Sequence, residues 1–144
     1  MTSGAMRAGD VVRLAVPATT AYVGVARSLA AGIATRLDLD LDHVEDLRLA
    51  VSEACGVLLP DAAPGAVLDL VVHVAGAGLA VELATTTSGD PAPPGPDSFA
   101  WTVLSALTDG IVADRVDGRT SIRLEFATGP DLVAPDGARG SAGP

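Results

Sequence analysis

Alternation of apolar and polar residues marks four stretches of the chain as half-buried β-strands. The apolar positions of these strands are Val12, Leu14 and Val16; Leu68, Leu70, Val72 and Val74; Leu79, Val81 and Leu83; and Ile122, Leu124 and Phe126. A fifth, shorter strand is expected over residues 111–115, before a turn at Asp117-Gly118. Each strand has one apolar and one mixed face, as expected of a sheet that helices cover on one side.

Three further stretches repeat their apolar residues at helical spacing. The repeating positions are Val23, Ala26, Ala30, Ile33 and Leu37 in the first, Val44, Leu47, Val51, Ala54, Cys55 and Leu58 in the second, and Phe99, Val103, Ala106 and Leu107 in the third. Thr19 or Thr20 can cap the first helix, and residues 42–45 (D-H-V-E) predict a capping box at the start of the second. The third helix is expected over residues 98–108, after a proline-rich loop at residues 88–96.

The order of these elements predicts the fold class. A strand, two helices, a hairpin, a loop, a helix and a final hairpin give a mostly antiparallel sheet with helices on one face. This arrangement is an α+β fold, a two-layer α/β sandwich. We expect one domain over residues 10–128, between flexible tails at residues 1–9 and 129–144 that are rich in Gly, Ala and Pro.

Composition narrows the classes of function. The 144 residues carry a formal net charge of −9, and no basic stripe is present to neutralise phosphates, which argues against direct nucleic-acid binding. An acidic surface suits a basic protein partner. Because aromatic residues make up only 3% of the chain, the core must consist of Leu, Val, Ile and Ala.

Cysteine and histidine usage points to packing rather than to metal chemistry. Cys55 lies inside an apolar helical pattern and is expected to be a small buried residue, which fits a reducing cytoplasm. His43 and His73 lack a second ligand at metal spacing, so we interpret both as structural and predict no metal site. The chain shows no signal-peptide pattern and no run of about 18 apolar residues, so we expect a cytoplasmic protein that does not enter a membrane.

A helical segment carries the first candidate chemistry. Residues 47–59 read L-R-L-A-V-S-E-A-C-G-V-L-L, which resembles the E-A-x-x-N motif of the GHKL ATPase superfamily. In that superfamily the Glu positions a water or a hydroxyl nucleophile, and the Asn holds Mg²⁺. Glu53 matches the Glu, but Val57 replaces the Asn and offers no oxygen to a cation that requires oxygen ligands. The resemblance therefore implies that Glu53 is a vestigial general-base position.

Two segments carry a closer resemblance, of which the first is widespread among GHKL kinases of this size and the second is more specific to one branch. Residues 46–55 read D-L-R-L-A-V-S-E-A-C, and residues 96–109 read P-D-S-F-A-W-T-V-L-S-A-L-T-D. Both are similar to the RsbW-type anti-sigma factors, in particular to the actinobacterial branch that includes the UsfX type. The resemblance extends over residues 11–127 and implies the GHKL (Bergerat) fold for the predicted sandwich.

The nucleotide motif that follows in the family is altered in this chain. In the family, D-x-G-x-G after a strand uses its Asp to bind the adenine amino group and its glycines to approach the ligand. Here Thr85 stands at the Asp position and Thr87 at the first Gly position. Threonine is neutral and β-branched, and it does not readily take a positive φ. The phosphate-binding glycines are replaced by S-F-A-W at residues 98–101.

These changes predict that Mg-ATP binds weakly or not at all, although the resemblance implies an ATP and Mg²⁺ site. Each lost charged or metal contact costs about 1.5–3 kcal/mol, by analogy with hydrogen bonds to charged groups. Two or three such losses lower the affinity for nucleotide by several orders of magnitude. We therefore expect no cofactor, and we expect binding to be the activity of the protein rather than catalysis.

The resemblance implies an anti-sigma factor that sequesters an alternative, stress- or development-type sigma factor. A STAS-domain anti-anti-sigma factor would release it. Family members bind sigma factors as dimers through the first strand-helix region, so residues 20–36 are the expected partner surface, with Arg27 and Arg36 as its binding residues. A second hypothesis is an ATP-dependent serine protein kinase that phosphorylates the STAS antagonist, with Glu53 as general base. A third is a degenerate GHKL domain that binds another signalling protein.

Several of the motif residues also have a structural interpretation. Glu53 can equally be a helix-surface carboxylate, and residues 85–87 are typical of a strand end. We interpret Phe99 and Trp101 as core anchors at the start of the third helix. The alternative for one of them is a role in contacting a partner.

Overall fold

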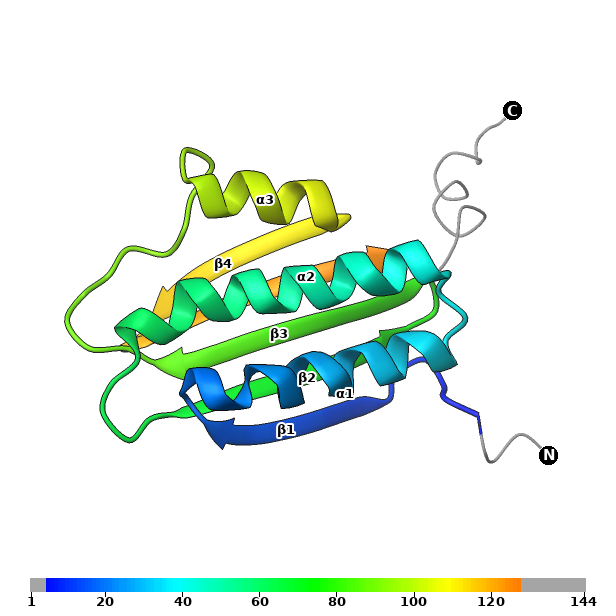
Figure 1. Ribbon diagram of the computed structural model, residues 1–144, viewed down its shortest axis with the longest axis horizontal. Coiled ribbons are helices and arrows are strands. Elements are labelled where there is room, and N and C mark those ends of the chain that lie inside the picture. Colours follow the sequence, from blue (N-terminus) through cyan, green and yellow to red (C-terminus); the bar gives the residue numbers. More distant parts are fainter. Residues whose placement is uncertain (1–4, 128–144) are drawn as a thin grey trace.

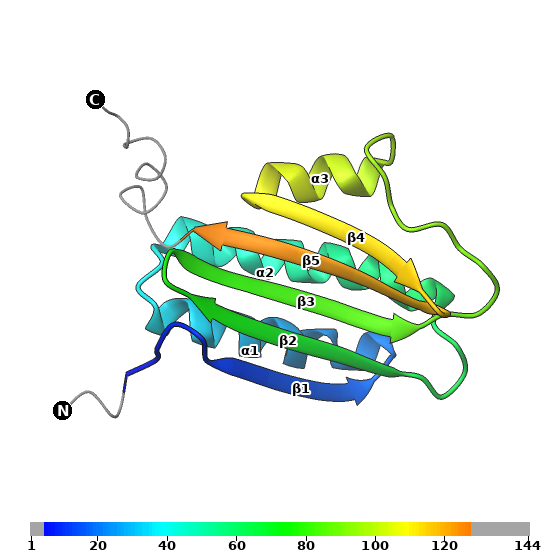
Figure 2. The same ribbon diagram turned by 180° about the vertical axis from the view of Figure 1, so that it is seen from behind.

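Five strands form one antiparallel sheet in the computed structural model, which describes residues 5–127. The strands lie in the order β1-β2-β3-β5-β4, and three α-helices cover one face of the sheet (Figure 1). The opposite face has no helix over it within the described residues (Figure 2). In chain order the elements are β1 (Val11–Pro17), η1 (Thr20–Tyr22), α1 (Val23–Arg36), α2 (Leu41–Leu58), η2 (Leu59–Asp61), β2 (Val67–Ala75), β3 (Gly78–Thr86), α3 (Phe99–Leu107), β4 (Gly110–Val116) and β5 (Arg119–Ala127). The predicted two-layer α+β sandwich is confirmed.

The register of the central strands explains where the core lies. Val81 of β3 pairs with Val72 of β2 on one side and with Leu124 of β5 on the other. Two residues further along β3, Leu83 pairs in the same way with Leu70 and Ile122. Because side chains alternate between the faces of a strand, these rows all point towards the helices. The predicted inward apolar positions face the helices in all four strands, but in β3 the outward Ala80 and Ala84 are buried as well, so burial does not alternate along that strand.

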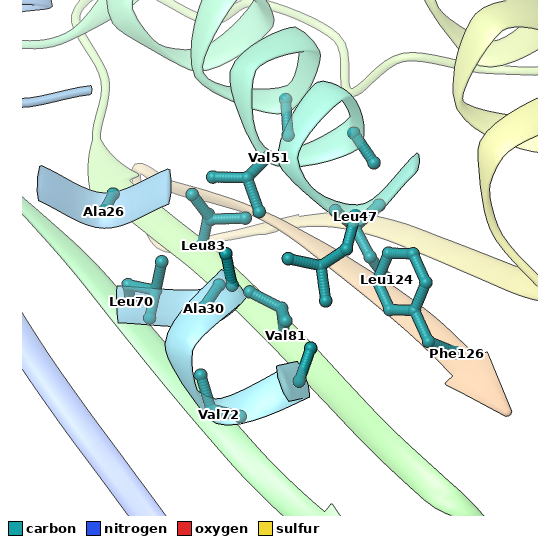
Figure 3. Close-up of a cluster of buried hydrophobic side chains, with 14 of the residues drawn as sticks. Ala26, Ala30, Leu47, Val51, Leu70, Val72, Val81, Leu83, Leu124 and Phe126 are labelled. Atoms are coloured by element: carbon teal, nitrogen blue, oxygen red, sulfur yellow. The ribbon is translucent and has the colours of Figure 1, made fainter. Parts of the chain in front are cut away.

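Helices α1 and α2 bury their apolar faces against these rows (Figure 3). Leu47 and Val51 of α2 are completely buried, as are Ala26 and Ala30 of α1. The alanines bring little volume, so α1 can lie close to its neighbours. Burying a Leu or Val side chain contributes about 1.5–3 kcal/mol, and the buried side chains are almost all aliphatic, as the composition predicts.

The N-terminus of α2 differs from the prediction. Asp40, not Asp42, is the N-cap, and its Oδ1 accepts a hydrogen bond from the His43 backbone N–H at 2.9 Å. The expected capping box is absent, since the Glu45 carboxylate lies 3.9 Å from Arg48 instead. Acidic residues alternate along this segment, and the helix begins at Leu41, two residues earlier than the capping-box pattern indicated.

The caps at the starts of α1 and α3 were also not fully predicted. A 3-10 turn, η1, precedes α1, and the side chain of Thr19 makes no capping hydrogen bond. Ser98 does cap α3, because its Oγ accepts a hydrogen bond from the Trp101 backbone N–H at 3.1 Å. The predicted apolar stripe of α3 is wrong for Phe99, which is 80% exposed, and it omits Leu104, which is fully buried, whereas Leu107 does pack against the core. The core-anchor interpretation of Phe99 is therefore wrong as well.

Two hairpin turns use left-handed backbone. Asp117 and Gly118, with φ of 53° and 78°, join β4 to β5 at the predicted turn. Gly78 at the start of β3 has φ 149°, and a Cβ there would lie 1.9 Å from the Phe126 carbonyl oxygen. Most of the two predicted tails lies outside the described residues. Of the N-terminal one, residues 5–9 are described: Met6 packs against the core, and the Gly9 N–H donates to the Val74 carbonyl at 2.8 Å.

Two leucines that stand two residues apart on α2 test the orientation of this helix. We expect Leu47→Ala to lower the free energy of unfolding by about 2–5 kcal/mol, because it leaves a cavity in the core. Leu49→Ala is the matched control: Leu49 is 56% exposed, so its truncation changes stability by about 0.5 kcal/mol or less. Urea denaturation of both variants measures the difference, and equal losses would contradict the assigned face.

The cap of α2 predicts a pH dependence. The hydrogen bond that the His43 ring donates to Asp40 raises the pKa of His43 above 6.5, and burial opposes the rise only in part. The backbone and side chain of His43 hold the pKa of Asp40 below 3.8. The stability contributed by His43 is therefore complete below pH 6.5 and is lost as the pH rises through its folded pKa. The contribution of Asp40 is complete above pH 3.8 and is lost as the pH falls through its own folded pKa.

A nuclear magnetic resonance titration of the His43 ring measures this pKa directly. Asp40→Asn is the matched variant, because asparagine is an equally good N-cap but carries no charge. We expect the pKa of His43 to fall towards 6.5 in this variant while α2 stays intact. An unchanged pKa would show that Asp40 is not the cause.

Candidate functional site

Glu53 and Val57 lie one turn apart on α2, which contacts both α1 and α3 (Figure 1). Both side chains are half-buried, and Val57 packs against the hydrophobic core. Within residues 5–127, no cationic group lies within 4 Å of the Glu53 carboxylate, which is partly open to solvent. The position that would hold Mg²⁺ in the family thus carries an aliphatic side chain that contributes to packing.

Thr85, at the adenine-binding position of the family motif, is fully buried on the inner face of β3. Its Oγ1 donates a hydrogen bond to the Val67 carbonyl of β2 at 2.8 Å. The only proton of the hydroxyl is therefore already used inside the sheet. The structure confirms the alternative interpretation of residues 85–87 as a strand end, because β3 runs to Thr86.

Two more threonines, Thr87 and Thr120, lie at the same end of the sheet. Thr87 lies directly after β3, and its Oγ1 donates to the Gly118 carbonyl at 3.2 Å. It also lies 3.1 Å from Oγ1 of Thr120 on β5, and both threonines are buried. Sequence analysis missed Thr120, although its inward position is visible from its alternation with Ile122. The polar side chains in this region satisfy one another without a ligand.

The arginines of the expected partner surface lie apart from each other on α1. Arg27 Nη1 donates to the Ser52 hydroxyl of α2 at 2.9 Å, which ties the side chain to the neighbouring helix. Arg36 lies in the last turn, where Nη1 donates to the Gly32 carbonyl at 3.2 Å and the side chain is exposed. Nine residues at 1.5 Å each separate them by about 13 Å along the helix axis. Arg36 is therefore the more accessible of the two.

A groove of about 540 Å³ lies between the start of α1 and the end of α2. Its mostly apolar lining is formed by Ala18, Thr19, Thr20, Val23, Ser52, Cys55, Gly56, Leu59 and Pro60. Cys55 is fully buried in the wall of the groove, and burial raises the pKa of its thiol to about 11. The thiol is thus neutral at physiological pH, and the prediction of a buried packing cysteine is confirmed. The groove borders the N-terminal end of the expected partner surface.

Arg115 of β4 holds the proline-rich loop, a role that sequence analysis did not find. Its Nη1 donates to Asp90 Oδ1 at 2.7 Å, and its Nη2 donates to the Gly89 carbonyl at 3.0 Å. The contacts join residues that are 25 and 26 positions apart, so no local pattern indicates them. The guanidinium fixes the loop where it leaves β3.

Within residues 5–127, no three His, Cys, Asp or Glu side chains are placed together as a metal site would require. The His43 ring bonds to Asp40 at 2.6 Å, and His73 Nε2 lies 3.7 Å from Glu82. No helix in this part of the chain is both long enough and apolar enough to span a bilayer.

The fold, together with the altered motif on α2 and β3, defines a small two-layer α+β protein consistent with the GHKL type. The chain is 41% identical over 111 residues to the anti-sigma-F factor RsbW of Mycobacterium tuberculosis, a match that covers 76% of this chain and 65% of the relative. It is 46% identical over 46 residues to the serine-protein kinase RsbW of Bacillus subtilis, covering 32% and 29%. The Bacillus licheniformis kinase of the same name is 45% identical over 49 residues, covering 34% and 31%.

These similarities confirm the resemblance to RsbW-type anti-sigma factors that the sequence indicated. No profile of a known protein family matches the chain. The match spans 65% of the length of the mycobacterial relative and about three tenths of the two Bacillus relatives.

The buried threonine of β3 gives a prediction for the site. Thr85→Val keeps the shape of the side chain but removes the donor to the Val67 carbonyl. We expect it to lower the free energy of unfolding by about 1 kcal/mol, because the part-buried Val67 carbonyl loses the hydrogen bond from the Thr85 hydroxyl. Thr85→Ser retains the hydroxyl and should lower the free energy of unfolding clearly less than Thr85→Val does. Thermal or urea unfolding of the two variants measures the difference, and equal losses would contradict a structural role for this hydrogen bond.

Proposed function

We propose that the protein is an anti-sigma factor, which binds an alternative, stress- or development-type sigma factor and keeps it from the RNA polymerase core. The observation that carries this proposal is the 41% identity over 111 residues to a mycobacterial protein named as an anti-sigma-F factor. A STAS-domain anti-anti-sigma factor would compete for the protein and release the sigma factor. Because sigma factors act on RNA polymerase, the protein would function in the cytoplasm.

We infer that this activity has little or no dependence on ATP. Val57 has no oxygen for Mg²⁺, and the Thr85 hydroxyl donates to a backbone carbonyl in the interior. The residues at these two positions do not fit a bound Mg-ATP. Release by competition alone needs no nucleotide, so the loss of these contacts leaves the proposed binding function intact.

Residues 20–36 are the surface that we propose for the sigma factor. The apolar groove at the start of α1 suits an apolar side chain of a partner, and Arg36 at the other end of the helix suits an acidic one. Arg27 would act mainly by holding α1 against Ser52 of α2. We further propose that the protein binds its partner as a homodimer, as the family resemblance implies.

The alternative function is an ATP-dependent serine protein kinase that phosphorylates the STAS antagonist. Two observations favour it: the Bacillus relatives are named serine-protein kinases, and Glu53 is retained with its carboxylate partly open to solvent. In this alternative Glu53 is the general base for the attacking serine hydroxyl. The kinase requires bound Mg-ATP, which separates it experimentally from the binding function.

Affinity purification of the tagged protein from its native cell tests the proposal, with partners identified by mass spectrometry. We expect a sigma factor in equal yield with and without Mg-ATP, and equally with Glu53→Gln. Arg36→Glu should weaken sigma-factor binding about tenfold, because it places like charges together. Arg13→Glu on the exposed sheet face is the matched control and should bind normally.

Other outcomes separate the hypotheses. Recovery that depends on Mg-ATP, together with phosphotransfer that Glu53→Gln abolishes, would establish the kinase. Absence of any sigma factor under both conditions would contradict the anti-sigma proposal, and only the fold assignment would remain.

A further inference from the structure

The outward side of α2 carries an unusual combination of side chains. Leu41 and Leu49 are 74% and 56% exposed, although leucine is ordinarily a buried residue. Glu45 and Glu53 continue the same four-residue spacing, so the four side chains follow one side of the helix. We call Leu41, Glu45, Leu49 and Glu53 the outer stripe. Within the described residues, no segment crosses in front of α2 (Figure 1).

The charges of the outer stripe lack strong partners. Within residues 5–127, Glu45 has one cation nearby, Arg48 at 3.9 Å, and Glu53 has none within 4 Å. Asp42 adds a further carboxylate beside Leu41, exposed like that of Glu45, whereas Glu53 is half-buried. An exposed pair at 3.9 Å neutralises little of this charge. The side of α2 that faces solvent is therefore both apolar and acidic.

The open face of the sheet, on the opposite side of the protein from α2, differs in how its charges are arranged. On the open side of the sheet, Arg119 Nη2 lies 2.6 Å from Asp69, and Arg123 Nε lies 3.4 Å from Glu125. Charges of both signs thus pair with each other across and along the strands. The charges of this face thus offset each other, whereas α2 carries four carboxylates, at Asp42, Glu45, Asp46 and Glu53, and one arginine, Arg48. Electrostatic complementarity at this helix selects a cationic partner.

We propose that the outer stripe of α2 is a docking surface for a basic amphipathic helix of a protein partner. Its leucines would meet the apolar side of that helix, and the exposed Asp42 and Glu45 would face lysines or arginines that flank it. The surface is distinct from residues 20–36 on α1. The inference rests on the proposed function only in that the sigma factor is the expected source of the helix.

A synthetic peptide is the first probe. It carries leucines at helical spacing with flanking lysines, and a scrambled peptide of the same composition is the reference. Fluorescence anisotropy with the full chain measures the dissociation constants. We expect tighter binding of the ordered peptide, a loss of at least about tenfold with the double variant Leu41→Ala/Leu49→Ala, and a smaller loss with Glu45→Lys. High salt should reduce the effect of Glu45→Lys.

Matched controls lie on the open sheet face. Val112 is 54% exposed on β4, and Glu125 is exposed on β5, so Val112→Ala and Glu125→Lys alter the same chemistry elsewhere. Both should bind the ordered peptide within about twofold of the unmodified protein, a difference below 0.5 kcal/mol. Equal binding of the two peptides, or equal losses in the stripe and control variants, would overturn the proposal.

The same variants with the co-purified sigma factor separate this inference from the proposed function. Loss of sigma-factor binding in the stripe variants supports both the docking surface and the proposed function. Normal sigma-factor binding in the stripe variants would overturn the inference and leave the function standing. If no sigma factor is recovered but the peptide still discriminates, the function fails and the docking surface stands. Conversion of a dimer to a monomer by Leu41→Ala/Leu49→Ala in sedimentation would assign the stripe to a second copy and overturn the proposal.

Discussion

The apolar contact between α2 and the central strands is the constraint on which the rest of the structure depends. Leu47 and Val51 reach onto rows of aliphatic side chains that β2, β3 and β5 bring into register (Figure 3). With so few aromatic residues, many modest contributions must be summed over a continuous interface. Small residues on α1 let that helix join the same layer. A one-residue shift of β3 would turn its whole apolar set to solvent, so the register and the helix position specify each other.

Once this face of α2 is fixed, the positions of its other side chains follow from helix geometry. Ser52 meets Arg27 of α1, whereas Glu53 and Val57 lie further round the helix at the margin of the core. Among the described residues, the outward Leu41 and Leu49 stay mostly exposed. Glu53 and Val57, two of the nucleotide-motif positions, thus share α2 with the exposed leucines, so a change that disturbs the core moves both. This coupling is why variants at this helix need stability controls before binding data are interpreted.

Periodicity predicted the elements of the fold because each strand and helix shows one apolar face, and this property is local. The errors concern features that the pattern does not determine. Asp38, Asp40 and Asp42 alternate before α2, and only the backbone conformation selects Asp40 as the cap. On α3, the position of Leu104 against the core decided which side is buried, and Phe99 was left outside. The contacts of Arg115 and Thr120 join distant segments, so no local spacing could reveal them.

The buried threonines explain how the end of the sheet is stable where the family motif would bind a ligand. A carboxylate at position 85 would need a donor, whereas a threonine hydroxyl can donate to the Val67 carbonyl beside it. Thr87 and Thr120 satisfy each other in the same way. An unpaired buried polar group costs about 1–3 kcal/mol, so a site built for a ligand is less stable when it is empty. The threonine set removes that cost, and the protein can keep its fold, and present its helices to a partner, without a nucleotide.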